Sequence, residues 1–191
     1  MKICVYGASS DNIDPQYLRE GEALGLAMAK RGHSLVFGGG GHGMMGAVAR
    51  GMTAGGGTIV GVAPRFFDKD DILYKDCTEF VFTETMRERK SIMEERADAF
   101  IMTPGGIGTF EEFYEILTLR QLGRHNKAIA VLNTKGYYEP LLQMQKRAME
   151  QGFMKPACEA LSGWFDAPEP LLDYLESTAA TDLDVHHLKN I

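Results

Sequence analysis

The sequence predicts an α/β fold in which a doubly wound parallel sheet carries helices on both faces. Short runs of β-branched and aromatic residues alternate along the chain with segments of helical period, which is the pattern of strands joined by crossover helices. The 191 residues, 45% hydrophobic and 24% charged, suit one compact domain. We expect a single domain over residues 1–177 and a frayed tail over residues 178–191.

Each element follows from its local pattern. The predicted strands are Lys2–Tyr6, Ser34–Phe37, Thr58–Val62, Glu79–Phe82, Ala99–Met102 and Ala128–Leu132. The predicted helices are Pro15–Arg31, Gly43–Ala54, Met86–Ala97, Thr109–Leu122 and Tyr138–Gln151. In such a sheet, ligands bind at the carboxyl ends of the strands. The residues that follow each strand are therefore the candidates for chemistry.

Charge and cysteine content exclude several classes of protein. A net charge of −6 and a pI near 5.4 argue against binding of nucleic acid, which needs a basic face. No run of ~18 apolar residues is present, so we expect no membrane segment. The three cysteines, Cys4, Cys77 and Cys158, form no Cys-x-x-Cys pair, and the histidines show no metal-ligand spacing. We therefore predict a cytoplasmic protein without a metal site.

Three loops at the expected sheet edge are rich in glycine or small residues, at residues 6–10, 38–46 and 103–109. Gly41, Gly43 and Gly46 match G-x-G-x-x-G, which suggests a dinucleotide site. The motif follows the second strand instead of the first, however, and the next strand ends without a carboxylate. What remains is that backbone N–H groups at a helix N-terminus attract an anion such as phosphate. The alternative is that these glycines only permit tight turns.

The stretch "TPGGIGTFEEF" places a glutamate directly behind the third loop. Thr109 and Glu112 have the T-x-x-E spacing of a capping box, in which the glutamate bonds back to the backbone of the cap. The pattern alone favours capping, because capping boxes are common and catalytic glutamates are not. A catalytic carboxylate is the alternative interpretation.

Two cations lie on the apolar stripe of the preceding helix. Met86, Met93 and Ala97 define this stripe by their spacing, and Arg89 and Lys90 fall on it. A cation that points inward needs an anionic partner, from the protein or from a ligand. We favour a ligand.

At this point two motifs carry a family resemblance. "PGGIGTFEE" and "MRERK" resemble the P-G-G-x-G-T-x-x-E and M-x-x-R-K motifs of the Lonely Guy family of cytokinin riboside 5′-monophosphate phosphoribohydrolases. The likeness extends from "VYGASS" through "LVFGGGGHGMMGAVA" and "GVAPRFF" to "KAIAVLNTKGYYEPLL". It implies a Rossmann-like nucleotide-binding domain that hydrolyses the N-glycosidic bond of a purine nucleoside 5′-monophosphate. The products would be free base and ribose 5-phosphate, and no cofactor is implied.

The resemblance also implies roles for particular residues. Arg89 and Glu112 would form the catalytic pair. The residues implied to bind substrate are Gly39, Gly40, Gly41, Gly43, Met86, Lys90, Gly105, Gly106, Ile107, Gly108, Thr109, Glu111 and Thr118. The chain departs from many members at Arg87, where they have histidine. Members were often labelled lysine decarboxylases, but no lysine here lies in a recognisable pyridoxal phosphate setting.

The residue types agree with glycoside cleavage, because breaking the ribose C1′–N bond builds positive charge on the ribose and negative charge on the base. A carboxylate and a cation can stabilise these charges. The alternative is a non-catalytic nucleotide or phosphosugar binding or carrier module on the same fold. The preferred purine, N6-modified or plain adenine, is left open.

The predicted helix that follows the third loop is apolar on more than one face. Leu119 and Leu122 would lie away from the sheet, where a lone domain exposes them. The resemblance implies a homodimer that buries them. The alternative is that the chain's own segment around Trp164 covers them.

Overall fold

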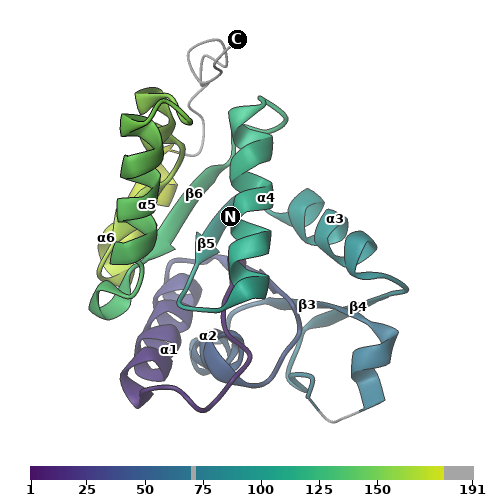
Figure 1. Ribbon diagram of the computed structural model, residues 1–191. Coiled ribbons are helices and arrows are strands. Elements are labelled where there is room, and N and C mark those ends of the chain that lie inside the picture. Colours follow the sequence, from purple (N-terminus) through teal and green to yellow (C-terminus); the bar gives the residue numbers. More distant parts are fainter. Residues whose placement is uncertain (70–71, 179–191) are drawn as a thin grey trace.

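The computed structural model describes residues 1–69 and 72–178. Within them a sheet of seven parallel strands has the order β4-β3-β2-β1-β5-β6-β7 (Figure 1). The chain builds outward from β1 in one direction through β4, and then returns to the other side of β1 with β5. This arrangement confirms the predicted doubly wound α/β fold.

The bounds of the elements agree closely with the sequence prediction. The strands are β1 Lys2–Tyr6, β2 Ser34–Phe37, β3 Ile59–Pro64, β4 Glu79–Thr83, β5 Ala99–Met102, β6 Ala128–Leu132 and β7 Gly163–Phe165. The α-helices are α1 Pro15–Lys30, α2 Gly43–Ala54, α3 Met86–Arg96, α4 Ile107–Gln121, α5 Glu139–Glu150 and α6 Pro168–Thr178. Short 3₁₀ segments are η1 Arg65–Lys69, η2 Thr134–Gly136 and η3 Pro156–Leu161.

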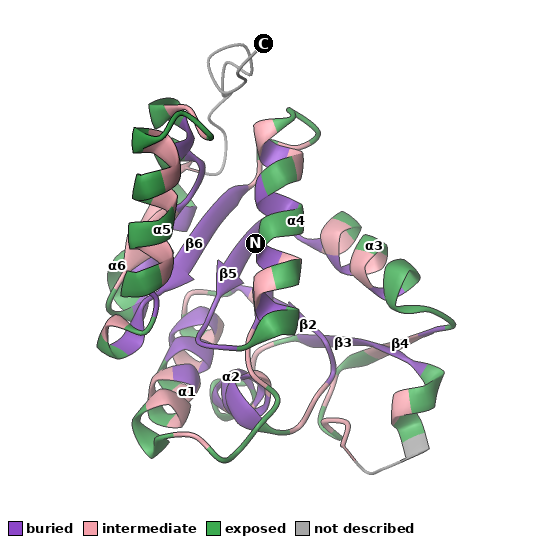
Figure 2. Cartoon of the chain, in the orientation of Figure 1, coloured by how far each residue is buried: buried purple, intermediate pink, exposed green. Residues whose placement is uncertain are grey.

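Two apolar layers lie on opposite faces of the sheet (Figure 2). Alternate residues of β1 point to opposite sides, so Ile3 joins one core and Cys4 the other. The first core packs against α1, α2 and α6, and the second packs against α3, α4 and η3. Because the strands are covered on both faces, they read in the sequence as nearly continuous apolar runs.

The structure corrects the C-terminal part of the prediction. Strand β7 was not predicted because it has only three residues, and α6 was not predicted either. Leu171, Leu172 and Leu175 of α6 are fully buried in the first core, so this helix is part of the domain. The tail was predicted to start at residue 178, but Thr178 is the last residue of α6. Residues 179–191 lie outside the described part of the chain.

The order of the strands brings three loops together. Strand β1 lies between β2 and β5, and the loops that leave the carboxyl ends of these three strands are those that the sequence singled out. One residue connects them directly. The Ala8 N–H donates to the Pro104 carbonyl at 3.1 Å, and the Ala8 carbonyl accepts from Met45 N at 3.2 Å. The strand order reverses at β1, and this topological switch point is where parallel α/β sheets bind their ligands.

Candidate active site

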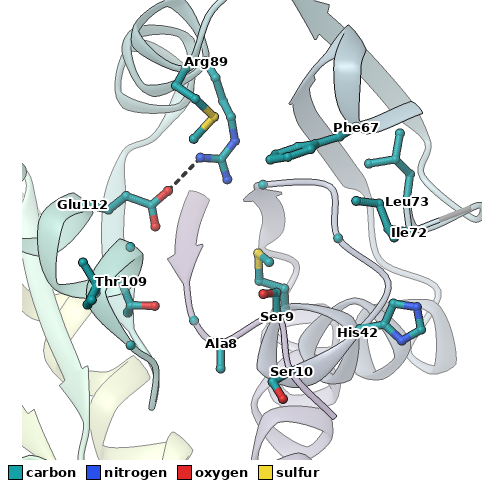
Figure 3. Close-up of a pocket in the computed structure, with 18 residues that line it drawn as sticks. Ala8, Ser9, Ser10, His42, Phe67, Ile72, Leu73, Arg89, Thr109 and Glu112 are labelled. Carbon is teal, nitrogen blue, oxygen red and sulfur yellow. Dashed lines mark hydrogen bonds and ion pairs between the residues drawn. The ribbon is translucent and has the colours of Figure 1, made fainter. Parts of the chain in front are cut away.

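A cavity of about 630 Å³ lies at this switch point. Its walls come from the loops after β1, β2 and β5, from the first turn of α4, and from the segment that follows β3 (Figure 3). Predicted site residues that line the cavity are Gly40, Met86, Arg89, Gly106, Ile107, Gly108, Thr109 and Glu112. Residues far apart in the sequence thus meet around one space of a size suited to a small ligand.

An ion pair joins α3 to α4 at the wall of the cavity (Figure 3). Arg89 Nη1 donates to Glu112 Oε1 at 2.8 Å, and Arg89 Nε donates to the Val62 carbonyl at 3.1 Å. The two charged side chains are only 6% and 13% exposed. Burial raises the pKa of Glu112, and the adjacent Arg89 guanidinium opposes that shift. Arg89 therefore favours the ionised form of a carboxylate that burial alone would tend to protonate.

The capping-box interpretation of Thr109 and Glu112 is wrong. Helix α4 begins at Ile107, its N-cap is Gly106, and no side chain caps it. Thr109 is thus already inside the helix, where its buried side chain packs over Gly105. A Cβ on Gly105 would lie 2.1 Å from Thr109 Oγ1, so only glycine permits this approach. The carboxylate of Glu112 is consequently directed to Arg89 and not to the helix end.

Lys90 finds its partners on α4, outside the cavity. Its Nζ pairs with Glu111 and lies 2.9 Å from Glu115 Oε2. The sequence favoured a ligand as the anionic partner of the two inward cations. In the structure, carboxylates of the protein itself take that place for both Arg89 and Lys90.

The N-terminus of α4 is open to the cavity. Gly106, Ile107 and Gly108 line it, and a Cβ placed on Gly106 or Gly108 would meet nothing within 4 Å. Neither glycine has a positive φ, so tight turn geometry does not require glycine at these two positions. The first N–H groups of a helix lack partners inside the helix and carry the positive end of its dipole. This end of α4 is suited to an anion.

The second glycine loop differs from this arrangement. The Gly41 N–H donates to the Ile72 carbonyl at 2.7 Å, and the Gly43 N–H donates to Asp11 Oδ1 at 2.7 Å. Gly39 has a φ of +76° and lies against the Phe80 ring. The sequence predicted that N–H groups of this loop bind an anion, but those of Gly41 and Gly43 are already bonded within the chain. Gly39 is required by its backbone conformation.

An apolar wall closes the other side of the cavity. Phe67, Ile72 and Leu73 lie across the cavity from Glu112, as the close-up shows (Figure 3). The segment of Ile72 and Leu73 is held by the glycine loop, since Tyr74 N donates to the Gly39 carbonyl at 2.8 Å. Sequence reasoning missed this wall, because the residues from 68 to 76 carried no motif. The loop at residues 6–10 was singled out by its small side chains, but none of its residues was assigned to the site, although Gly7 to Ser10 line the cavity.

The remaining predicted residues lie outside this cavity of the single chain. They are Gly39, Gly41, Gly43, Lys90, Gly105, Glu111 and Thr118. Thr118 is exposed near the C-terminal end of α4. No group of three or more His, Cys, Asp or Glu side chains is arranged for a metal ion in the described ranges. In the same ranges, no helix combines the length and apolar character needed to span a membrane.

Solved structures with this fold include several that are distant in sequence. A molybdenum cofactor binding protein from Rippkaea orientalis aligns over 94% of this chain and 96% of its own, with a TM-score of 0.70 and 19% identity. The molybdenum cofactor carrier protein of Chlamydomonas reinhardtii aligns over 94% and 98%, with a TM-score of 0.69 and 19% identity. At this identity the likeness concerns the fold alone.

Curated relatives are closer in sequence. A cytokinin riboside 5′-monophosphate phosphoribohydrolase of Rhodococcoides fascians is 42% identical over 156 residues, which cover 81% of this chain and 79% of the relative. An enzyme of the same name from Arabidopsis thaliana is 39% identical over 155 residues, 81% of this chain and 71% of the relative. A family described as "Possible lysine decarboxylase" matches residues 45–175. The chain therefore belongs to this family, which includes the cytokinin riboside 5′-monophosphate phosphoribohydrolases.

Proposed function

We propose that the protein hydrolyses the N-glycosidic bond of a purine nucleoside 5′-monophosphate and releases free base and ribose 5-phosphate. The observation that carries this proposal is the buried Arg89–Glu112 pair on the wall of a cavity that also receives the open N-terminus of α4. A carboxylate, a cation and an anion site thus surround one space. The names of relatives at 35–42% identity support the same activity.

Glu112 is suited to the ribose. Arg89 engages Oε1, and no hydrogen bond to Oε2 is found among the described residues. This oxygen can accept from a ribose hydroxyl or orient the attacking water. As the C1′–N bond breaks, positive charge develops on the ribose, and an ionised carboxylate in a partly dehydrated site stabilises it. Attack of water at C1′ then completes the ribose 5-phosphate, and the proton that this water releases balances the negative charge of the departing base.

Arg89 has two tasks in this proposal. It favours ionisation of Glu112, as the direct contact between the two side chains indicates. Its guanidinium also lines the cavity, where it can hold the nucleotide and favour departure of the base with its electron pair. The division of labour between these tasks is open to experiment, because loss of Arg89 affects both.

The 5′-phosphate is assigned to the start of α4. The N–H groups from Gly106 to Thr109 would supply several charge-assisted hydrogen bonds, each contributing roughly 1.5–3 kcal/mol. Lys90, Glu111 and Thr118 lie outside the cavity of one chain. Their predicted contacts with the substrate remain part of the proposal. The chain through the end of α6 at Thr178 would act as one nucleotide-binding domain without a cofactor.

We further propose a homodimer. Among the described residues, α5 contains no buried side chain, and Met144 and Phe153 are 61% and 83% exposed. Leu122 at the end of α4 is 44% exposed, although the Trp164 ring packs on Phe113 of the same helix. The chain's own C-terminal segment thus leaves Leu122 open, and a second copy would cover it. A cytoplasmic location is part of the same proposal, favoured by three cysteines that form no disulfide among the described residues.

The proposal is tested by incubating the purified protein with purine and pyrimidine nucleoside monophosphates and measuring released base and ribose 5-phosphate. AMP and its N6-substituted analogues are expected to be cleaved, with a kcat/KM roughly 10³-fold above that of adenosine. Failure to release base from every monophosphate contradicts the proposal. Tight binding of AMP without cleavage would instead support the alternative, a non-catalytic nucleotide or phosphosugar carrier.

A further inference from the structure

Two helix N-termini face the same cavity, and a single residue contacts both. The Ala8 N–H bonds to Pro104, just before α4, while its carbonyl accepts from Met45 in the first turn of α2. Gly106 and His42, the N-caps of α4 and α2, both line the cavity. The positive ends of two helix dipoles are therefore presented to one ligand. A site with both ends open would suit two adjacent phosphates.

The two ends are not equivalent. The N-terminus of α4 has no side-chain cap and is bordered by open space. At α2 the Asp11 carboxylate accepts from Gly43 N at 2.7 Å and lies 2.6 Å from His42 Nδ1. The bond from the Gly43 N–H, followed by that from His42, lowers the pKa of Asp11, so it is ionised at neutral pH. A fixed negative charge thus occupies the end of α2, where a second phosphate would otherwise bind.

We propose that Asp11 is a specificity-determining residue that restricts the substrate to one terminal phosphate and rejects nucleoside diphosphates and triphosphates. This inference rests on the proposed assignment of the 5′-phosphate to α4. A β-phosphate would extend from α4 past Ser9 and Ser10 toward His42, which also lines the cavity and whose Nδ1 contacts the Asp11 carboxylate. The carboxylate withholds the Gly43 N–H and repels the added charge.

A purely structural role for Asp11 as a cap of α2 makes a different prediction. A cap contributes to stability, and its loss affects every substrate to the same degree. A charge placed beside the phosphate changes the ratio between substrates that differ in charge. The discriminating quantity is therefore the ratio of kcat/KM for ADP to kcat/KM for AMP.

Asp11→Asn separates the two roles, because the amide oxygen still accepts from Gly43 N while the charge is removed. The ADP to AMP ratio is expected to rise on the order of tenfold, as a Coulomb interaction of about 1.4 kcal/mol near the surface implies. Asp14→Asn is the matched control. Asp14 also caps a helix, accepting from Gln16 N at 2.9 Å, but Gln16 does not line the cavity, whereas His42, the partner of Asp11, does. In this variant the ratio should stay at the value of the unmodified protein.

An unchanged ratio in folded Asp11→Asn overturns the inference, and Asp11→Ser, a second neutral cap former, must give the same rise. Binding keeps the test independent of catalysis. Calorimetry with inorganic phosphate and pyrophosphate should show phosphate preferred by the unmodified protein, with the preference reduced in Asp11→Asn. Preference for pyrophosphate in the unmodified protein contradicts the inference even if no variant folds. Absence of base release from AMP, with this binding pattern intact, counts against the proposed reaction and not against Asp11.

Discussion

Arg89 Nη1 lies 2.8 Å from Glu112 Oε1, and this contact links α3 to α4 where both helices border the cavity. Neither charge is freely hydrated, since the side chains are 6% and 13% exposed. A buried ion pair costs desolvation and is weak as a stabilising device. Its position at a cavity, instead of within an apolar core, favours a role in chemistry.

The first prediction concerns Glu112. Glu112→Gln is expected to lower turnover of AMP by roughly 10²-fold or more, because the amide cannot stabilise positive charge on the ribose. The free energy of unfolding should fall by less than the roughly 3–5 kcal/mol expected for a buried charge without any partner, since the amide oxygen still accepts from Arg89. Base release and denaturant unfolding measure the two effects.

Glu115→Gln is the matched control for this variant. Glu115 also lies on α4 and pairs with a cation, Lys90, but it is outside the cavity. Its loss should leave turnover unchanged. If Glu112→Gln keeps its activity and loses stability, Glu112 is a structural residue.

The second prediction concerns Arg89 and pH. Arg89→Ala is expected to abolish base release and to cost roughly 3–5 kcal/mol of stability at neutral pH, because it leaves Glu112 buried without its partner. Burial then raises the pKa of Glu112 further. A raised folded-state pKa contributes stability below the unfolded pKa and loses it as pH rises through the folded value.

The stability deficit of Arg89→Ala should therefore be small near about pH 5 and grow toward about pH 8. Denaturant unfolding at several pH values measures it, with the unmodified protein as reference. A deficit that is the same at every pH would show that Arg89 does not control the ionisation of Glu112. Unchanged activity in this variant would remove Arg89 from the proposed pair.

The fold could be predicted from the sequence because its strands are covered on both faces. Segments such as Ala128–Leu132 are continuously apolar and bounded by polar residues, so their type and limits are legible. Strand β7 has three residues and no such contrast. The start of α4 was misplaced by two residues because Thr109 resembles an N-cap, whereas Gly106 has that position.

The sequence identified the charged residues of the site but could not show which of them contact one another. The stripe of α3 indicated that Arg89 points inward, and the structure shows it buried. The sequence could not show that Glu112 reaches Arg89, because that contact depends on how α3 and α4 lie on the sheet. The role of Asp11 could not be predicted from the sequence either, because its bond to Gly43 joins residues 32 positions apart.

The third prediction concerns assembly. Light scattering at micromolar concentration is expected to give twice the chain mass of 21.1 kDa. Leu122→Glu should shift the protein toward the monomer, because it places a charge on the apolar surface that a second copy would cover. Phe66→Ser is the control, since Phe66 is 50% exposed on η1, in another part of the fold. A mass near 21 kDa for the unmodified protein would contradict the dimer.

The last prediction tests whether the open start of α4 holds phosphate. A Cβ added at Gly108 meets nothing within 4 Å, so Gly108→Ala should fold without strain. Alanine is favoured over glycine in a helix by up to about 1 kcal/mol, and the free energy of unfolding should stay constant or rise.

The added methyl group would nevertheless crowd an anion that approaches the first N–H groups of the helix. We expect kcat/KM for AMP to fall roughly tenfold, a loss of about 1.4 kcal/mol, while that for adenosine, which has no phosphate, changes little. Gly106→Ala, equally open but at the N-cap, should lower kcat/KM for AMP in the same way without the gain in stability. A stabilised variant that cleaves AMP as well as the unmodified protein does would mean that this loop binds no phosphate.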